Sequence, residues 1–223
     1  MFIGHYAVGF GAKAFARKLS LGSLFLAAQF VDLLWPILLL LGFEHVRIVP
    51  GITKFTPLDF ESYPISHSLL LVIGWAILFA VIYWFSKRYI RGSIVLGLCV
   101  VSHWFLDLIV HRPDLPLYPG NYPLFGFGLW NYSIGTVFLE GMLFLLGVLF
   151  YFRTTKALDK IGIYGFWSLV GILLIIYIGN ILGPAPPNAA AIAWAGNTQW
   201  LFIFWAYWID RHRIARDNTA SLA

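Results

Sequence analysis

Six long apolar runs, separated by short polar or proline-containing segments, dominate the chain. Each run has roughly 20 residues, the length that an α-helix needs to cross about 30 Å of hydrocarbon. The runs cover residues 21–41, 65–85, 92–110, 130–152, 161–182 and 189–209. This pattern predicts an all-α protein, a polytopic transmembrane helical bundle with about six spans.

The segments at the two ends of the chain differ from these runs. Residues 1–18 are apolar but too short to span a membrane, so we expect a half-inserted or interfacial helix there. This segment has no basic n-region or small-residue cleavage site, which argues against a removable signal peptide. Residues 210–223 are polar, and we expect a frayed tail. With no internal repeat, residues 1–223 form a single integral membrane domain in this prediction.

The composition supports a membrane protein and excludes a soluble one. Of the residues, 60% are hydrophobic and 11% are charged, whereas a soluble domain carries about 25% charged residues. The net charge of +5 is therefore interpreted as membrane topology and lipid contact, with no nucleic-acid partner. Cys99 is the sole cysteine in the sequence, so an internal disulfide is excluded.

Basic residues gather in alternate connections between the apolar runs. They are Lys13, Arg17, Lys18, Lys87, Arg88, Arg91, Arg153, Lys156, Lys160, Arg211, Arg213 and Arg216. The positive-inside rule then places both ends of the chain on the cytoplasmic side. The loops at 43–64, 112–129 and 183–188, which carry few basic residues, are expected on the outer side.

The third apolar run ends in a stripe of ionisable residues. His103, Asp107 and His111 are spaced four residues apart, so they share one face of a helix. Burying such groups without partners is costly, and imidazole with carboxylate suits a divalent metal, zinc first, with iron and manganese as alternatives. The alternative is a structural stripe of hydrogen bonds between helices.

Polar residues also recur at one depth. Counted from the cytoplasmic end of each helical segment, a polar residue follows after about 12 residues, which is about 18 Å of helix. These residues are His5, Asp32, His103, Glu140 and Gln199. We therefore expect one polar layer just past the middle of the bilayer, with His67 and His111 nearer its outer rim.

Several of these residues have candidate roles in chemistry. His5, His67 and Asp32 are candidate metal ligands, and a kink at Pro36 would turn the Asp32 carboxylate inward. Glu140, a carboxylate in apolar surroundings, is the first candidate general base, and Asp32 is the second. The alternatives are an interfacial histidine at 67, an incidental His5 and packing hydrogen bonds for the two acids. Arg112 is a candidate for contacting an anionic substrate group.

Four motifs resemble a known family. They are GHYAVGF at 4–10, Asp32 ahead of a Trp-Pro pair, SHSLL at 66–70 and SHWFLD at 102–107. Together they resemble the membrane-bound metal-dependent hydrolases of bacterial inner membranes. The resemblance implies a metal site formed by His5, Asp32, His67, His103 and Asp107.

The chain departs from that family at two positions. Other members often carry a second acid just after the Asp32 position and a second histidine shortly before His67. Here Leu34 and Ser62 stand at those places. The resemblance thus implies a leaner ligand set than a two-metal site needs, which His111 compensates in part.

We therefore expect a membrane-embedded, metal-dependent hydrolase that cleaves a lipid-type ester or phosphoester from the outer leaflet. The expected cofactor is a divalent metal ion, and the expected partner is a membrane lipid. One alternative is a transporter or conduit for protons or metal ions through the same layer. The polar layer lies in the outer half and no inverted repeat is evident, which argues against transport. The other alternative is a non-catalytic scaffold.

Overall fold

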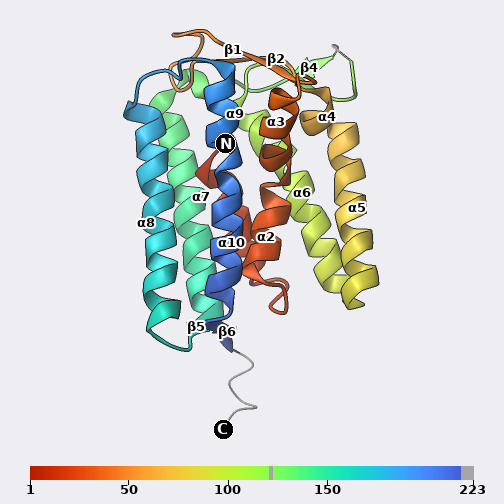
Figure 1. Ribbon diagram of the computed structural model, residues 1–223, viewed down its shortest axis with the longest axis vertical. Coiled ribbons are helices and arrows are strands. Elements are labelled where there is room, and N and C mark those ends of the chain that lie inside the picture. The colour runs from red at the N-terminus through yellow and green to blue at the C-terminus, as the bar shows by residue number, and fades with distance from the viewer. Residues whose placement is uncertain (121–122, 217–223) are drawn as a thin grey trace.

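The computed structural model describes residues 1–120 and 123–216, and its helices stand side by side in one bundle (Figure 1). Four of these helices are long and apolar enough to cross a membrane. They are α5 (Leu69–Lys87), α6 (Ile90–Val110), α7 (Ser133–Thr154) and α8 (Lys160–Leu182). The predicted all-α class of membrane protein is confirmed at this level.

The first apolar run forms two helices instead of one. α2 (Leu21–Ala28) and α3 (Phe30–Leu40) meet at a bend of 55°, and together they are long enough for a fifth crossing. The expected kink at Pro36 is wrong in position, because Pro36 lies inside α3 and the break is at Gln29. The reason is local: Gln29 leaves helical geometry, with φ −99° and ψ 0°.

The last apolar run is also divided. α9 (Ala189–Asn197) and α10 (Gln199–Asp210) meet at Thr198, and each is too short to cross a membrane by itself. Within the described residues, the helices suited to a crossing therefore number four, or five if α2 and α3 count as one. The sixth span of the sequence prediction remains a prediction.

The N-terminal segment forms α1 (Ile3–Ala12), which lies in the interior of the bundle. It packs against α2, α6 and α7, and almost all of its side chains are buried. Its ten residues cover about half of a bilayer. The half-inserted length fits the prediction, whereas the interfacial alternative is wrong because other helices surround α1.

Short strands and turns close both ends of the bundle (Figure 1). At one end lie β1 (His45–Ile48), β2 (Leu58–Ser62), α4 (Pro64–His67), β3 (Leu115–Pro116), β4 (Leu124–Phe125) and the 3-10 helix at Leu129–Asn131. At the other end β5 (Thr155–Ala157) pairs with β6 (Arg213–Ala215). The expectation of a frayed tail is therefore wrong for residues 213–215, because backbone hydrogen bonds hold them; residues 217–223 lie outside the described part.

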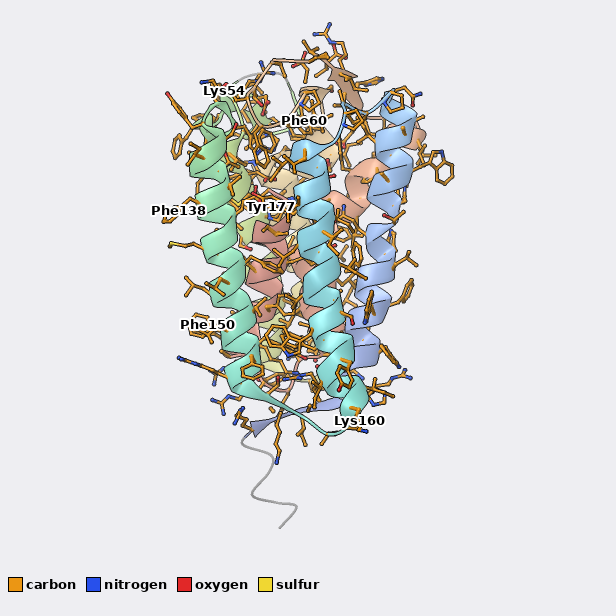
Figure 2. The ribbon with its side chains drawn as sticks, turned by 90° about the vertical axis from the view of Figure 1, so that its left-hand side faces the viewer. Lys54, Phe60, Phe138, Phe150, Lys160 and Tyr177 are labelled. Carbon is orange, nitrogen blue, oxygen red and sulfur yellow. The ribbon has the colours of Figure 1, made fainter. Side chains whose placement is uncertain are left out.

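The outward faces of the long helices are apolar. Phe138 and Phe150 point away from α7, 66% and 51% exposed, while Tyr177 lies between α7 and α8 (Figure 2). Exposed aliphatic and aromatic side chains of this kind contact lipid tails in a membrane protein.

Candidate metal centre

Six of the predicted site residues meet in the upper half of the bundle, below the β1–β2 end. They are His5 on α1, Asp32 on α3, His67 on α4, His103 and Asp107 on α6, and His111 directly after α6. The side chains of all but Asp32 are almost fully buried, and that of Asp32 is 22% exposed. The predicted polar layer is therefore a compact cluster.

Four donor atoms lie close together, and those of Asp32, His67 and His103 fall within 4.8 Å of one another. The Oδ1 atom of Asp32 lies 3.7 Å from His67 Nε2 and 3.5 Å from His103 Nε2. The Oδ2 atom of Asp107 lies 3.9 Å from His67 Nε2 and 3.2 Å from His103 Nε2. Ligands of a tetrahedral zinc ion are about 3.4 Å apart when each bond is about 2.05 Å. These side chains therefore fit a divalent ion with little movement.

The helix break at Gln29 orients His103. Ala28 is the last residue before the break, and His103 Nδ1 lies 2.9 Å from its carbonyl oxygen. Because a carbonyl only accepts, Nδ1 carries the proton of the neutral ring, and Nε2 has its lone pair exposed to the cluster. His103 Nε2 is fully buried and has no hydrogen-bond partner. A metal ion would satisfy it, since ligating histidines commonly bind a carbonyl through their other nitrogen.

A similar chain of bonds orients His67. Its Nδ1 atom lies 2.6 Å from Ser66 Oγ, which donates to Glu44 Oε2 at 2.6 Å. The other Glu44 oxygen accepts the main-chain N–H groups of Ile65 and Ser66, both at 2.8 Å. With its hydroxyl proton given to Glu44, Ser66 accepts from His67, so Nε2 again faces the cluster.

Asp107 connects these ligands to a second pair of histidines. Its Oδ1 atom lies 3.1 Å from His5 Nε2 and 3.9 Å from His111 Nε2. The main-chain nitrogen of Met1 is 2.5 Å from the same oxygen. The rings of His5 and His103 stack with centroids 3.5 Å apart. One carboxylate thus faces two groups of imidazoles, one on each oxygen.

His111 is held from the outer side. Its Nδ1 atom lies 2.8 Å from Asp114 Oδ1, which also accepts from the Tyr63 hydroxyl at 2.8 Å. Burial raises the pKa of the Tyr63 phenol well above its usual value, and the Asp114 carboxylate adds to this. Tyr63 therefore stays protonated and continues to donate.

Arg112 lies at the rim and already has an anionic partner. Its Nη2 atom donates to Asp59 Oδ1 at 2.6 Å, and its Nε atom is 3.9 Å from Asp114. Asp59 also accepts from Arg47 at 2.8 Å. Burial raises the pKa of Asp59, but hydrogen bonds from the two arginines outweigh this, and its pKa lies below the usual value. Arg112 is thus paired more closely with Asp59 than with Asp114.

Glu140, the candidate general base, is fully buried on α7. Its Oε2 atom accepts from the Gly4 amide at 3.4 Å, and its Oε1 atom has no hydrogen-bond partner. It contacts α1 one residue away from His5. An unpartnered carboxylate oxygen at this place is available to a proton or a bound water.

Two parts of the cluster were not predicted. Glu44 lies in the predicted loop at 43–64 and Ser66 was named only within the SHSLL motif, whereas both orient His67. The Ser-His pair in the SHS motif was the available signal for Ser66. Gln199, predicted in the polar layer, bonds between helices: it accepts from Tyr6 at 3.2 Å and donates to the Asp32 carbonyl at 3.4 Å.

Comparisons with known proteins add little to this geometry. No protein-family model matches the chain, and no solved structure matches it significantly. Over 55 residues the chain is 36% identical to NADH-ubiquinone oxidoreductase chain 3 of Zea mays. This match covers 25% of the chain and 44% of the relative. The candidate site therefore has to be interpreted from its own geometry.

Proposed function

We propose that the chain is a membrane-embedded, metal-dependent hydrolase of the kind that its motifs resemble, and that it cleaves a lipid ester or phosphoester with water. The proposal rests on one observation. Asp32, His67 and His103 bring donor atoms within 4.8 Å of one another, Asp107 Oδ2 lies within 3.9 Å of both rings, and outer hydrogen bonds orient both rings. If these residues formed only a structural network of hydrogen bonds, the buried His103 Nε2 atom should have a hydrogen-bond partner. It has none.

In this proposal Asp32, His67, His103 and Asp107 hold the ion, and their two carboxylates offset its charge in the apolar interior. The mixed nitrogen and oxygen donors favour zinc, with iron and manganese as alternatives. When bound, such an ion polarises the scissile group and lowers the pKa of a coordinated water.

The remaining groups have roles in orientation and proton transfer. Glu140 takes the proton of the attacking water, because one of its oxygens has no other partner. Asp32, the most exposed of the four ligands, is the second candidate for this role. His5 and His111 orient Asp107 through its Oδ1 atom, while Arg112 contacts an anionic substrate group only after it leaves Asp59.

We further propose that the protein belongs to a bacterial inner membrane and crosses it six times, with the broken pair α9 and α10 as the sixth crossing. The C-terminal strand β6 then lies on the cytoplasmic side. The expectation of a cytoplasmic N-terminal end is wrong, because the Met1 nitrogen contacts Asp107 inside the bundle. The basic residues near β5 and β6, at the end of the bundle opposite β1 and β2, support this orientation (Figure 1). The metal centre then opens toward the outer side.

The first test is elemental analysis of the detergent-purified protein. The wild type should hold about one zinc, iron or manganese ion per chain, and both His103→Ala and Asp107→Ala should lose it. His45→Ala, which changes an exposed histidine of the same end, should retain it. A wild type that holds no metal, even after reloading with each of the three ions, would contradict the proposal.

Activity is the second test. Turnover of a fluorogenic phospholipid ester should disappear in the two variants that lose metal and persist in His45→Ala. Bound metal without turnover, combined with metal or proton flux in sealed vesicles, would instead favour the conduit.

A further inference from the structure

An apolar groove lies directly below the metal centre, on the membrane-facing side of α1. It has a volume of about 510 Å³ and passes between α6 and α7. Its floor is the row of small α1 residues Gly4, Ala7 and Gly11, and its rim includes Leu98 and Phe150. The rim residues are 62% and 51% exposed, so the groove is open to the side.

One end of the groove lies beside the polar cluster, because its lining residues there are neighbours of cluster residues in the chain. There its lining consists of Gly4, Ser102 and Leu143. Gly4 and Ser102 directly precede His5 and His103 in the chain, and the Gly4 amide contacts Glu140. The groove then follows α1 away from the centre to Phe15 and Phe150. A ligand in it would have one end at the site and the other near the β5–β6 end.

The lining chemistry selects a hydrocarbon chain. The lining residues are aliphatic or aromatic apart from Ser102 and Cys99, and the Ser102 hydroxyl already donates to the Cys99 carbonyl at 2.7 Å. The rim belongs to helices whose outward faces are apolar, so lipid tails are the surrounding solvent. The groove volume of about 510 Å³ lies within the range of about 300–1,000 Å³ that small-ligand pockets measure.

We propose that this groove holds the hydrocarbon chain of the lipid substrate, with the bond to be cleaved at the Gly4 end and the chain end near Phe15. This rests on the proposed hydrolase function. The substrate enters sideways between α6 and α7 from the bilayer. The Met1 side chain packs on Gly4 at the upper end of the groove, and a flexible thioether can shift to admit the chain.

The glycines of the chain supply a matched pair of variants. A Cβ at Gly11, which lines the groove, would meet nothing closer than Gly147 Cα at 3.9 Å, so Gly11→Phe adds a ring there without a backbone collision at its Cβ. A Cβ at Gly171 on α8 would meet nothing within 4 Å, so Gly171→Phe adds the same ring elsewhere on a spanning helix. Leu98→Trp is a second blocking variant, because Leu98 is exposed at the rim.

The probe is a phosphatidylcholine with a photoreactive diazirine at the end of one C16 chain, mixed into nanodiscs. In the wild type we expect cross-links near Phe15 and Phe150. Gly11→Phe and Leu98→Trp should lower their yield about fivefold or more, and Gly171→Phe should leave it unchanged. Equal yields in all variants, or cross-links at Gly4 and Ser102 instead, would overturn the proposal, because the second result describes a lipid bound in the opposite direction. Cross-links between two copies of the chain would also overturn it.

The metal content of the same samples separates this proposal from the proposed function. Blocking the groove should leave the metal in place, because none of the three variants changes a ligand. If the wild type holds no metal but is cross-linked near Phe15 and Phe150, lipid binding in the groove is supported and the hydrolase proposal is refuted. If the wild type holds metal but is not cross-linked there, lipid binding in the groove is refuted and the metal centre is supported.

Discussion

Each ligating imidazole of the proposed centre is oriented by a bond on its far side. His103 donates to the Ala28 carbonyl, and His67 donates to Ser66, which in turn donates to Glu44. In both rings the lone pair of Nε2 faces the two carboxylates. Bonds of this type fix the tautomer and strengthen a ligand, so their removal weakens a metal site without removing a ligand.

Glu44→Gln tests whether the bond from Glu44 through Ser66 to His67 strengthens the metal site. The amide oxygen can still accept the N–H groups of Ile65 and Ser66, while the charge that holds the Ser66 hydroxyl is lost. We expect metal affinity to fall about 10- to 100-fold, as measured by competition with a chromogenic chelator. Glu61→Gln on the same β-hairpin is the control, because Glu61 pairs with exposed Arg47. Unchanged affinity in Glu44→Gln would show that this bond does not support the centre.

At the scale of elements, the position of α1 depends on small residues. α1 is a short helix inside the bundle, and α7 approaches it closely at Gly147. A Cβ at that glycine would collide with the main-chain oxygen and Cα of Ala7. Because α1 carries His5 and the floor of the groove, this helix contact also sets the distance between the metal centre and the groove.

A pair of alanine substitutions tests that contact. Gly147→Ala should lower the thermal unfolding temperature in detergent, because backbone atoms cannot rotate away from the added methyl group. Gly141→Ala on the same helix should be neutral or stabilising by up to about 1 kcal/mol, since a Cβ there meets nothing within 4 Å. Equal unfolding temperatures for the two variants would show that α1 shifts to accept the methyl group.

At the scale of the whole molecule, the two ends of the bundle differ in chemistry. One end is covered by the β1–β2 hairpin and the loop that follows α6, and lies close to the metal centre (Figure 1). The other end carries β5, β6 and many of the basic residues. This asymmetry underlies the proposed orientation, in which the centre opens outward.

Single cysteines test the orientation. Cys99 is the sole cysteine of the sequence and is buried, so Cys99→Ala provides a background without other thiols. In that background Lys54→Cys should react with a membrane-impermeant maleimide added outside intact cells, whereas Lys156→Cys should react only after lysis. Both lysines are exposed. Lys54 lies at the end of the bundle that carries β1 and β2 (Figure 2), and Lys156 lies in β5 at the opposite end (Figure 1). The reverse labelling pattern would invert the proposed topology.

Hydrophobic periodicity and spacing were sufficient to predict the helical class and most residues of the buried polar cluster. A helix places residues four apart on one face whatever surrounds it, so His103 and Asp107 could be paired from the sequence. Depth counting worked for His5 and Asp32 because the rise per residue of a helix is constant. These are local properties of the backbone, and neighbouring helices do not change them.

The contacts between segments were decided only by tertiary packing. The break at Gln29, the burial of α1 and the bonds from Glu44 through Ser66 to His67 depend on which helices lie side by side. Glu44 is 22 residues from Ser66 in the chain, and no periodicity relates them. The apolar groove likewise arises where α6 and α7 flank the small residues of α1. The break, the hydrogen bonds and the groove depend on how side chains of different helices fit together. The order of residues along a single helix does not specify this fit.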